Sequence, residues 1–234
     1  MKMRAALLGA VAVMGLAPAA FADRGTDGEV KLTFPQAVSI MNPYLSGGTK
    51  DIYASSMVLE PLAGLDPNGV MVPKLVAEIP TLENGGISAD MTSITWKLLP
   101  DLKWSDGSAV TADDAVFTWQ YCTHPEGGCS QATKFEGIAS VEAVDPSTIK
   151  VTFAAPKANP YTAFVSALSP VLQKAQFEAC LGAAAPTCTD ANNMPVGTGP
   201  FKVTGFTVND TVSMAANENY RDPAKPAFAT AVIK

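Results

Sequence analysis

The chain has 234 residues, of which 47% are hydrophobic, and a formal net charge of −6 from 22 acidic and 16 basic residues. This length and apolar content are enough for one large or two small folded units. The acidic balance disfavours nucleic acids and anionic membrane surfaces as partners, because binding to either requires clustered Lys and Arg.

The first 22 residues have the pattern of a secretory signal. Lys2 and Arg4 precede an apolar run over residues 5–16, and Ala20-Phe21-Ala22 is a small-x-small cleavage site. A membrane-spanning helix is the weaker alternative, because the run is shorter than the roughly 20 residues that cross a bilayer. No cysteine follows at a lipid-attachment position. The pattern therefore predicts a signal peptide over 1–22 and a soluble exported protein that is not a lipoprotein.

Short strands alternate with turns and short helices along the rest of the chain. Asp66-Pro67-Asn68-Gly69, Asp145-Pro146 and Asn209-Asp210 are turn signals between apolar stretches. The periodicity predicts strands at 30–34, 94–98, 138–144, 149–153, 201–204 and 211–216, a hairpin over 64–72, and helices at 51–62, 161–168 and 171–180. Such a mixture without a regular repeat predicts a mixed α/β (α+β) fold rather than a bundle or a sandwich.

The most informative stretch is residues 104–120, WSDGSAVTADDAVFTWQ. Asp106-Gly107 predicts a turn, and Thr111 with Asp114 forms a capping-box pattern at the start of a helix. An apolar face then follows at helical spacing, formed by Ala112, Ala115, Val116 and Trp119. The acids near a Trp could also be taken for a catalytic site. Capping and the helix dipole account for them better, and no base is near in sequence.

Four cysteines follow the predicted signal as two local pairs, Cys122 with Cys129 and Cys180 with Cys188. In an oxidising compartment these pairs predict two disulfides that close loops, although four cysteines allow three connectivities. A zinc site is the alternative. Neither pair has the two-to-four-residue gap of structural zinc ligands.

Enzymatic chemistry is poorly supported by the remaining residues. The chain has one histidine, His124, which lies in a loop, and it lacks a zinc-protease His pair, a Gly-x-Ser-x-Gly elbow and a phosphate-cradling Gly-Lys-Ser/Thr. Asp106 and Glu136 are the one conceivable glycosidase pair, but the sequence does not show their separation. We therefore expect no catalytic residues, no metal site and no cofactor.

Three separated motifs resemble one known family. Residues 104–119 resemble the signature segment of the family 5 extracytoplasmic solute-binding proteins, the oligopeptide and dipeptide receptors of ABC importers. Residues 195–201, PVGTGPF, resemble the family's glycine-rich turn, and 217–226 its N-x-x-Y…KP ending. The resemblance implies the type II periplasmic-binding-protein fold. In that fold, 23–49 and 192–234 would form a discontinuous first lobe and 50–191 a smaller inserted domain.

The resemblance also implies a function. The chain would be a monomeric periplasmic substrate-binding component that captures peptides for an inner-membrane ABC permease, although related scaffolds bind nickel, haem, opines or sugars. Ser46, Gly47, Gly48 and Thr49 would line the ligand cleft and offer backbone groups, whereas a plain strand-to-helix loop is the alternative for this stretch. Phe135, in a loop, is a further cleft candidate.

Family members are about twice as long as this sequence, so the resemblance implies an N-terminal fragment truncated before the second lobe. Two rival functions remain at this point. A secreted hydrolase predicts turnover, and a half-receptor that acts as a protein interaction module predicts an exposed apolar patch.

Overall fold

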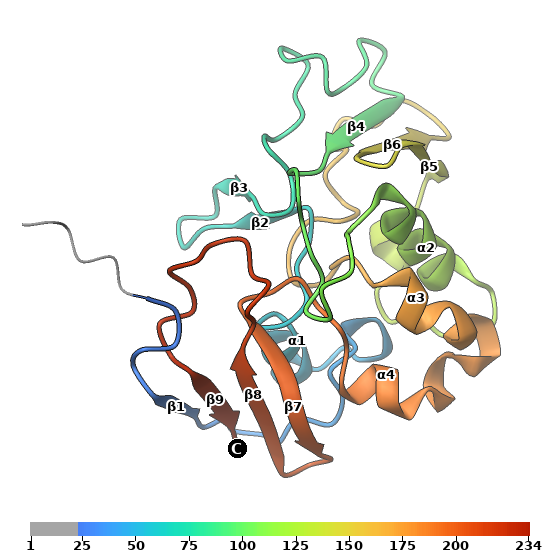
Figure 1. Ribbon diagram of the computed structural model, residues 1–234. Coiled ribbons are helices and arrows are strands. Elements are labelled where there is room, and N and C mark those ends of the chain that lie inside the picture. Colours follow the sequence, from blue (N-terminus) through green and yellow to red (C-terminus); the bar gives the residue numbers. More distant parts are fainter. Residues whose placement is uncertain (1–22) are drawn as a thin grey trace, which may run out of the picture.

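The computed structural model describes residues 23–234 (Figure 1). The predicted signal peptide, residues 1–22, lies outside the described part of the chain. Two larger sheets, a two-stranded sheet and two hydrophobic clusters organise the described residues, with helices gathered beside them (Figure 1). The mixed α/β class expected from the sequence is therefore confirmed.

The first sheet joins the two ends of the described chain. Its strands are β1 (Glu29–Leu32), β7 (Phe201–Thr207), β8 (Thr211–Ala216) and β9 (Thr230–Ile233), in the order β1-β9-β8-β7. β1 and β9 are parallel, and the other pairs are antiparallel. Its inner face packs on the smaller cluster, which consists of Val38, Met41, Ala54, Val58, Phe201, Val212, Met214, Ala231 and Ile233.

The second sheet carries the larger cluster. It contains β4 (Ser93–Lys97), β5 (Ile138–Asp145) and β6 (Thr148–Phe153), in the order β4-β6-β5 and all antiparallel. Helix α2 (Ala112–Thr123) packs against β5 and β6. Trp96 and Trp104 are almost completely buried there. A separate hairpin of β2 (Ala63–Leu65) and β3 (Met71–Pro73) bends at the predicted Asp66–Gly69 turn.

Short helices connect these layers. They are η1 (Pro43–Leu45), α1 (Thr49–Ser55), η2 (Ala132–Phe135), α3 (Lys174–Phe177), η3 (Glu178–Cys180), η4 (Gly182–Thr187) and α4 (Thr189–Asn193). Two disulfides, Cys122–Cys129 and Cys180–Cys188, close the loops as predicted, with Cα–Cα distances of 5.1 and 5.7 Å. Within residues 23–234, no three His, Cys, Asp or Glu side chains are grouped to hold a metal ion. Over the same residues, no helix combines the length and apolarity needed to span a bilayer.

The capping box of α2 is present in both directions. The Thr111 side chain accepts from the third-position amide, and the Thr111 amide donates to the Asp114 carboxylate at 2.9 Å. The predicted buried face is only partly correct, because Val116 and Trp119 are half-buried whereas Phe117 and Tyr121 are buried. The helix is therefore rotated toward its aromatic residues, which pack on each other with ring centroids 6.0 Å apart.

Two helix predictions were wrong in extent. α1 ends at Ser55 rather than at residue 62, because the carbonyls of Met57 and Val58 accept instead from the amides of Phe201 and Gly199, at 3.2 and 2.8 Å. These long-range bonds compete with helical ones for the same acceptors. The helix predicted at 171–180 begins only at Lys174 and turns into η3 at Glu178.

The helix predicted at 161–168 does not form. Phe164 and Ser166 have φ of 59° and 72°, in the left-handed region that breaks a right-handed helix. The Phe164 carbonyl accepts from the amides of Leu62 and Ala63, and the Ser166 amide donates to Ala63. Tertiary bonds to β2 thus replace the helical bonds that the sequence pattern predicts.

Candidate functional site

Segment 46–49 runs from the residue after η1 to Thr49, the first residue of α1, and its residues are half-buried or exposed. Ser46 (φ −141°, ψ 141°) and Gly48 (φ −78°, ψ 126°) are extended, and Gly47 and Thr49 are exposed. Within the described part of the chain, the N–H and the C=O of Gly47 have no hydrogen-bond partner. A side chain built on Gly47 would meet open space. Gly47, which lies between two extended residues, therefore presents one N–H and one C=O that are free to pair with another chain.

The Asp51 side chain holds segment 46–49 in its conformation through hydrogen bonds. Its carboxylate is buried and accepts hydrogen bonds from the Ser39 amide (2.8 Å), the Ser46 hydroxyl (2.7 Å) and the Lys50 ammonium (2.8 Å). Burial acts to raise the pKa of Asp51, but the hydrogen bonds from Lys50, Ser39 and Ser46 outweigh it and hold the pKa below its usual range. The Ser46 hydroxyl in turn accepts from the Gly48 amide at 3.0 Å. An ionised carboxylate thus sets the conformation of the segment.

Gln131 holds the segment from its other side. This buried side chain donates to the carbonyls of Ser46 (3.2 Å) and Pro43 (3.4 Å). The side-chain amide of Asn42 donates to the Tyr121 hydroxyl at 3.0 Å and to the side-chain oxygen of Asn192 at 2.8 Å. Sequence analysis missed the roles of Asp51 and Gln131, because both depend on contacts that no local pattern reveals.

The structure does not bring Phe135 to this surface. Phe135 ends η2 and is 3% exposed. Its ring packs edge-on against Phe164 at a centroid distance of 5.5 Å and obliquely against Tyr44 at 6.2 Å. The interpretation of Phe135 as a cleft residue is corrected, since it belongs to the larger hydrophobic cluster beneath η1.

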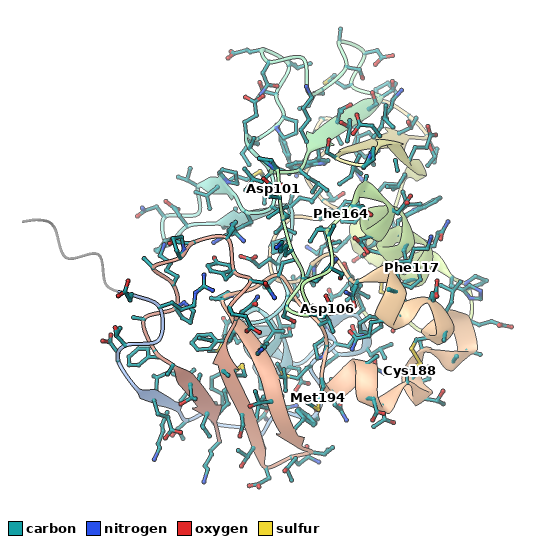
Figure 2. The ribbon with its side chains drawn as sticks, in the orientation of Figure 1. Asp101, Asp106, Phe117, Phe164, Cys188 and Met194 are labelled. Atoms are coloured by element: carbon teal, nitrogen blue, oxygen red, sulfur yellow. A yellow bond between two sulfur atoms is a disulfide. The ribbon has the colours of Figure 1, made fainter. Side chains whose placement is uncertain are left out.

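The three sequence motifs meet in space. The Ser105 amide donates to the Gly197 carbonyl at 2.9 Å, and the Asn219 side chain donates to the Ser105 carbonyl at 3.3 Å. The Asn217 side chain donates to the Gly199 carbonyl at 2.8 Å. Figure 2 shows the loop that carries Asp106 reaching from the second sheet toward β7 and β8. The motifs therefore form a junction between the two sheets.

The acids of this junction have structural partners. Asp106 accepts from the side chains of Ser108 (2.6 Å) and Gln173 (2.8 Å). Asp114 is buried, which raises its pKa, and it accepts from the amides of Thr111 and Lys174, both at 2.9 Å. These contacts favour the capping interpretation of the acids over a catalytic one.

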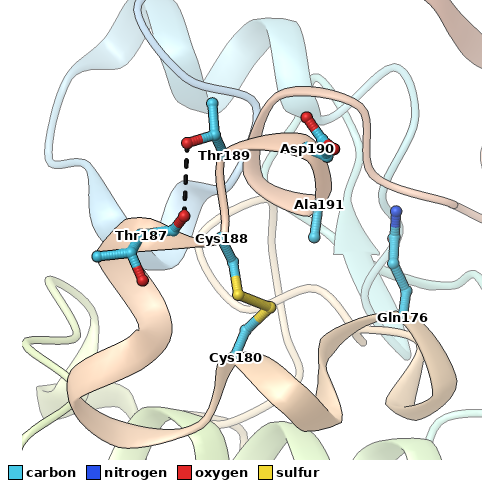
Figure 3. Close-up of a pocket in the computed structure, with 7 residues that line it drawn as sticks. All are labelled: Gln176, Cys180, Thr187, Cys188, Thr189, Asp190 and Ala191. Atoms are coloured by element: carbon cyan, nitrogen blue, oxygen red, sulfur yellow. Dashed lines mark hydrogen bonds between the residues drawn. A yellow bond between two sulfur atoms is a disulfide. The ribbon is translucent and has the colours of Figure 1, made fainter.

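Two hollows differ in their relation to segment 46–49. One of about 440 Å³ lies against the Cys180–Cys188 disulfide and is lined by Gln176, Cys180 and residues 187–191 (Figure 3). It shares no residue with the segment. The other, of about 150 Å³, is lined by Phe34, Pro35, Gln36, Thr49, Lys50 and Tyr53. It therefore adjoins the candidate site through Thr49.

Solved structures of substrate-binding proteins share this fold. One is the oligopeptide-binding protein AppA of Bacillus subtilis, solved in complex with a nonapeptide, which superposes with a TM-score of 0.77 at 20% sequence identity. The superposition covers 91% of this chain and 40% of the AppA chain. Another is NikZ of Campylobacter jejuni in complex with Ni(L-His), with a TM-score of 0.72 at 28% sequence identity. That superposition covers 89% of this chain and 39% of the NikZ chain. The fold is thus that of the oligopeptide-binding class.

The family model of bacterial extracellular solute-binding proteins, family 5 Middle, matches residues 71–234, and the chain belongs to this family. A putative ABC transporter peptide-binding protein of Brucella ovis is 31% identical over 139 residues, which are 58% of this chain and 25% of the relative. The glutathione-binding protein GsiB of Escherichia coli K12 is 25% identical over 186 residues, 80% of this chain and 34% of the relative. The chain spans about a quarter to a third of the length of these relatives.

Proposed function

We propose that the chain forms part of a periplasmic substrate-binding protein that captures peptides and delivers them to an inner-membrane ABC permease. The observation that carries the proposal is segment 46–49, which is extended at Ser46 and Gly48 and in which the backbone groups of the exposed Gly47 are unpaired within the described residues. Family membership and the peptide ligands named for the Brucella relative and for AppA support it.

The segment is suited to bind a peptide because the groups that it leaves unpaired, the N–H and C=O of Gly47, are main-chain groups. Strand addition pairs backbone with backbone, so affinity depends little on the ligand's side chains. Asp51 and Gln131 hold the segment in the extended conformation before any ligand arrives. Binding then costs less ordering of the receptor, which favours affinity.

The proposed mechanism is non-covalent capture between two lobes. In this proposal, 23–49 and 192–234 belong to the first lobe and 50–191 to an inserted domain, and support comes from the sheet that joins β1 to β7–β9. The portion of the relatives that this chain does not cover would supply the facing wall. Ligand would shift the balance between open and closed arrangements of a monomer.

The test uses the full-length protein that contains this chain. Its melting temperature is measured by thermal shift with pools of di- to hexapeptides, with sugars, and with Ni²⁺ plus L-histidine. A rise with peptides alone is expected, since a ligand that binds only the native state raises its stability. Peptide capture would be refuted if only sugars or only the nickel complex raised the melting temperature. It would also be refuted if none of these solutes raised it.

A further inference from the structure

The small hollow beside the candidate segment lies at the carboxyl end of a parallel strand pair. Phe34, Pro35 and Gln36 follow β1 after one intervening residue, Thr33. The Phe34 amide donates at 2.8 Å to the carbonyl of Lys234, the residue after β9. In open α/β sheets, ligands bind outside the carboxyl ends of parallel strands. Thr49 lines the hollow and also belongs to segment 46–49. A ligand chain paired with the segment would thus pass the mouth of the hollow.

The lining of the hollow offers no unpaired charge. Lys50 is its only charged residue, and the Lys50 ammonium donates to the Asp51 carboxylate at 2.8 Å and to the Ser39 hydroxyl at 2.5 Å. This cation is therefore already paired. The walls are the half-buried ring of Phe34 and the ring of Tyr53, a residue that is 61% exposed. A charged ligand side chain would find no unpaired charge of opposite sign among the lining residues, whereas an apolar one would lose only its water.

The volume fits one side chain. A hollow of about 150 Å³ with apolar walls is large enough for a benzene ring. An exposed aromatic residue such as Tyr53 also provides contact area at a small cost in conformational entropy, since it has two rotatable side-chain bonds. Size and polarity thus point to a phenyl or isobutyl group.

We infer that this hollow is a subsite for one apolar side chain of the bound peptide, carried by the residue that pairs beside Thr49. The inference rests on the proposed function and narrows its substrate class to peptides with a large apolar residue at that position. In this proposal, segment 46–49 binds the backbone of any peptide, and the hollow provides the preference for a large apolar side chain.

Isothermal titration calorimetry of the full-length protein tests this with four tripeptides: Ala-Ala-Ala, Phe-Ala-Ala, Ala-Phe-Ala and Ala-Ala-Phe. One phenylalanine peptide is expected to bind at least roughly tenfold tighter than trialanine. Tyr53→Ala is expected to remove most of that preference while it changes trialanine binding by less than about twofold. Val144→Ala, at an equally exposed position (60%) on β5, serves as the matched control and is expected to keep the preference.

The outcomes separate this inference from the proposed function. If trialanine binds and no phenylalanine peptide is preferred, the subsite is refuted and peptide capture stands. If a preference exists but Tyr53→Ala leaves it intact, the side chain binds elsewhere. If none of the four peptides binds, peptide capture itself fails, and the subsite fails with it.

Discussion

Replacing the Asp51 carboxylate by an amide tests the network beneath the candidate segment. In Asp51→Asn the shape is kept, but the Lys50 ammonium loses its ion partner, and the Ser39 and Ser46 donors lose a charged acceptor. Hydrogen bonds to charged groups contribute about 1.5–3 kcal/mol each, and breaking a buried pair costs about 3–5 kcal/mol. Because the Lys50 side chain is 18% exposed, water offsets part of this loss. We expect a loss of about 3 kcal/mol at pH 7.

Urea unfolding, followed by Trp fluorescence, measures this loss. With a slope of about 2 kcal/mol per molar urea, the midpoint should fall by about 1.5 M. Asp27→Asn, at an exposed position, is the control and should change stability by less than about 0.5 kcal/mol. An Asp51→Asn midpoint within 0.3 M, roughly, of the parent would refute the role of Asp51 in holding the segment.

The pH dependence gives an independent check. Folding lowers the pKa of Asp51 from its ordinary value of 3.8, so the ionised group stabilises the native state above that value. This contribution is lost as the pH falls through the lower pKa of the folded protein. The difference between parent and Asp51→Asn should therefore be full at pH 6 and shrink below about pH 4. A difference that stays constant down to about pH 2 would contradict the assignment.

Two further substitutions test the junction and the first sheet. Gly197→Ala should destabilise by about 3 kcal/mol or more in urea unfolding, because its Cβ would overlap the Val58 carbonyl; Gly47→Ala, which meets open space, is the matched control, and an equal effect would contradict the reasoning. Arg24→Ala should cost about 2 kcal/mol and speed hydrogen exchange over 217–225, since its guanidinium donates to four carbonyls there at 2.6–2.8 Å. Unchanged exchange over 217–225 would count against that anchoring role.

Local signals in the sequence predicted local structure well. The capping box at Thr111 and Asp114 and the turn at 66–69 satisfy their hydrogen bonds within a few residues. The disulfides join cysteines that are seven and eight positions apart, so proximity in sequence was sufficient to pair them. In each case the determining contacts are short-range.

The errors occurred where distant backbone groups compete. α1 stops at Ser55 because Met57 and Val58 bond to the glycine-rich turn some 140 residues away, and the predicted helix at 161–168 gives way to bonds with β2. No local periodicity contains that information. The same reason explains Phe135, whose loop position suggested exposure although Tyr44 and Phe164 enclose it.

The candidate site was predictable only through family resemblance. Gly47 and Thr49 are small or polar residues with no chemical signature of their own, and the supports Asp51 and Gln131 are recognisable only from their contacts. Whether Ser46–Thr49 bind ligand stays a prediction.

The most direct test of the central claim compares Gly47→Pro with Gly47→Ala in the full-length protein. Proline removes the free amide, and the extended Ser46 before it accommodates the ring, whereas alanine keeps the amide. Calorimetric titration with the peptide that gives the largest thermal shift should show an affinity about tenfold weaker for the proline variant than for the alanine variant, as expected for one lost hydrogen bond that leaves the ligand carbonyl unpaired. Equal affinities, with both variants folded, would show that the peptide does not pair with this backbone.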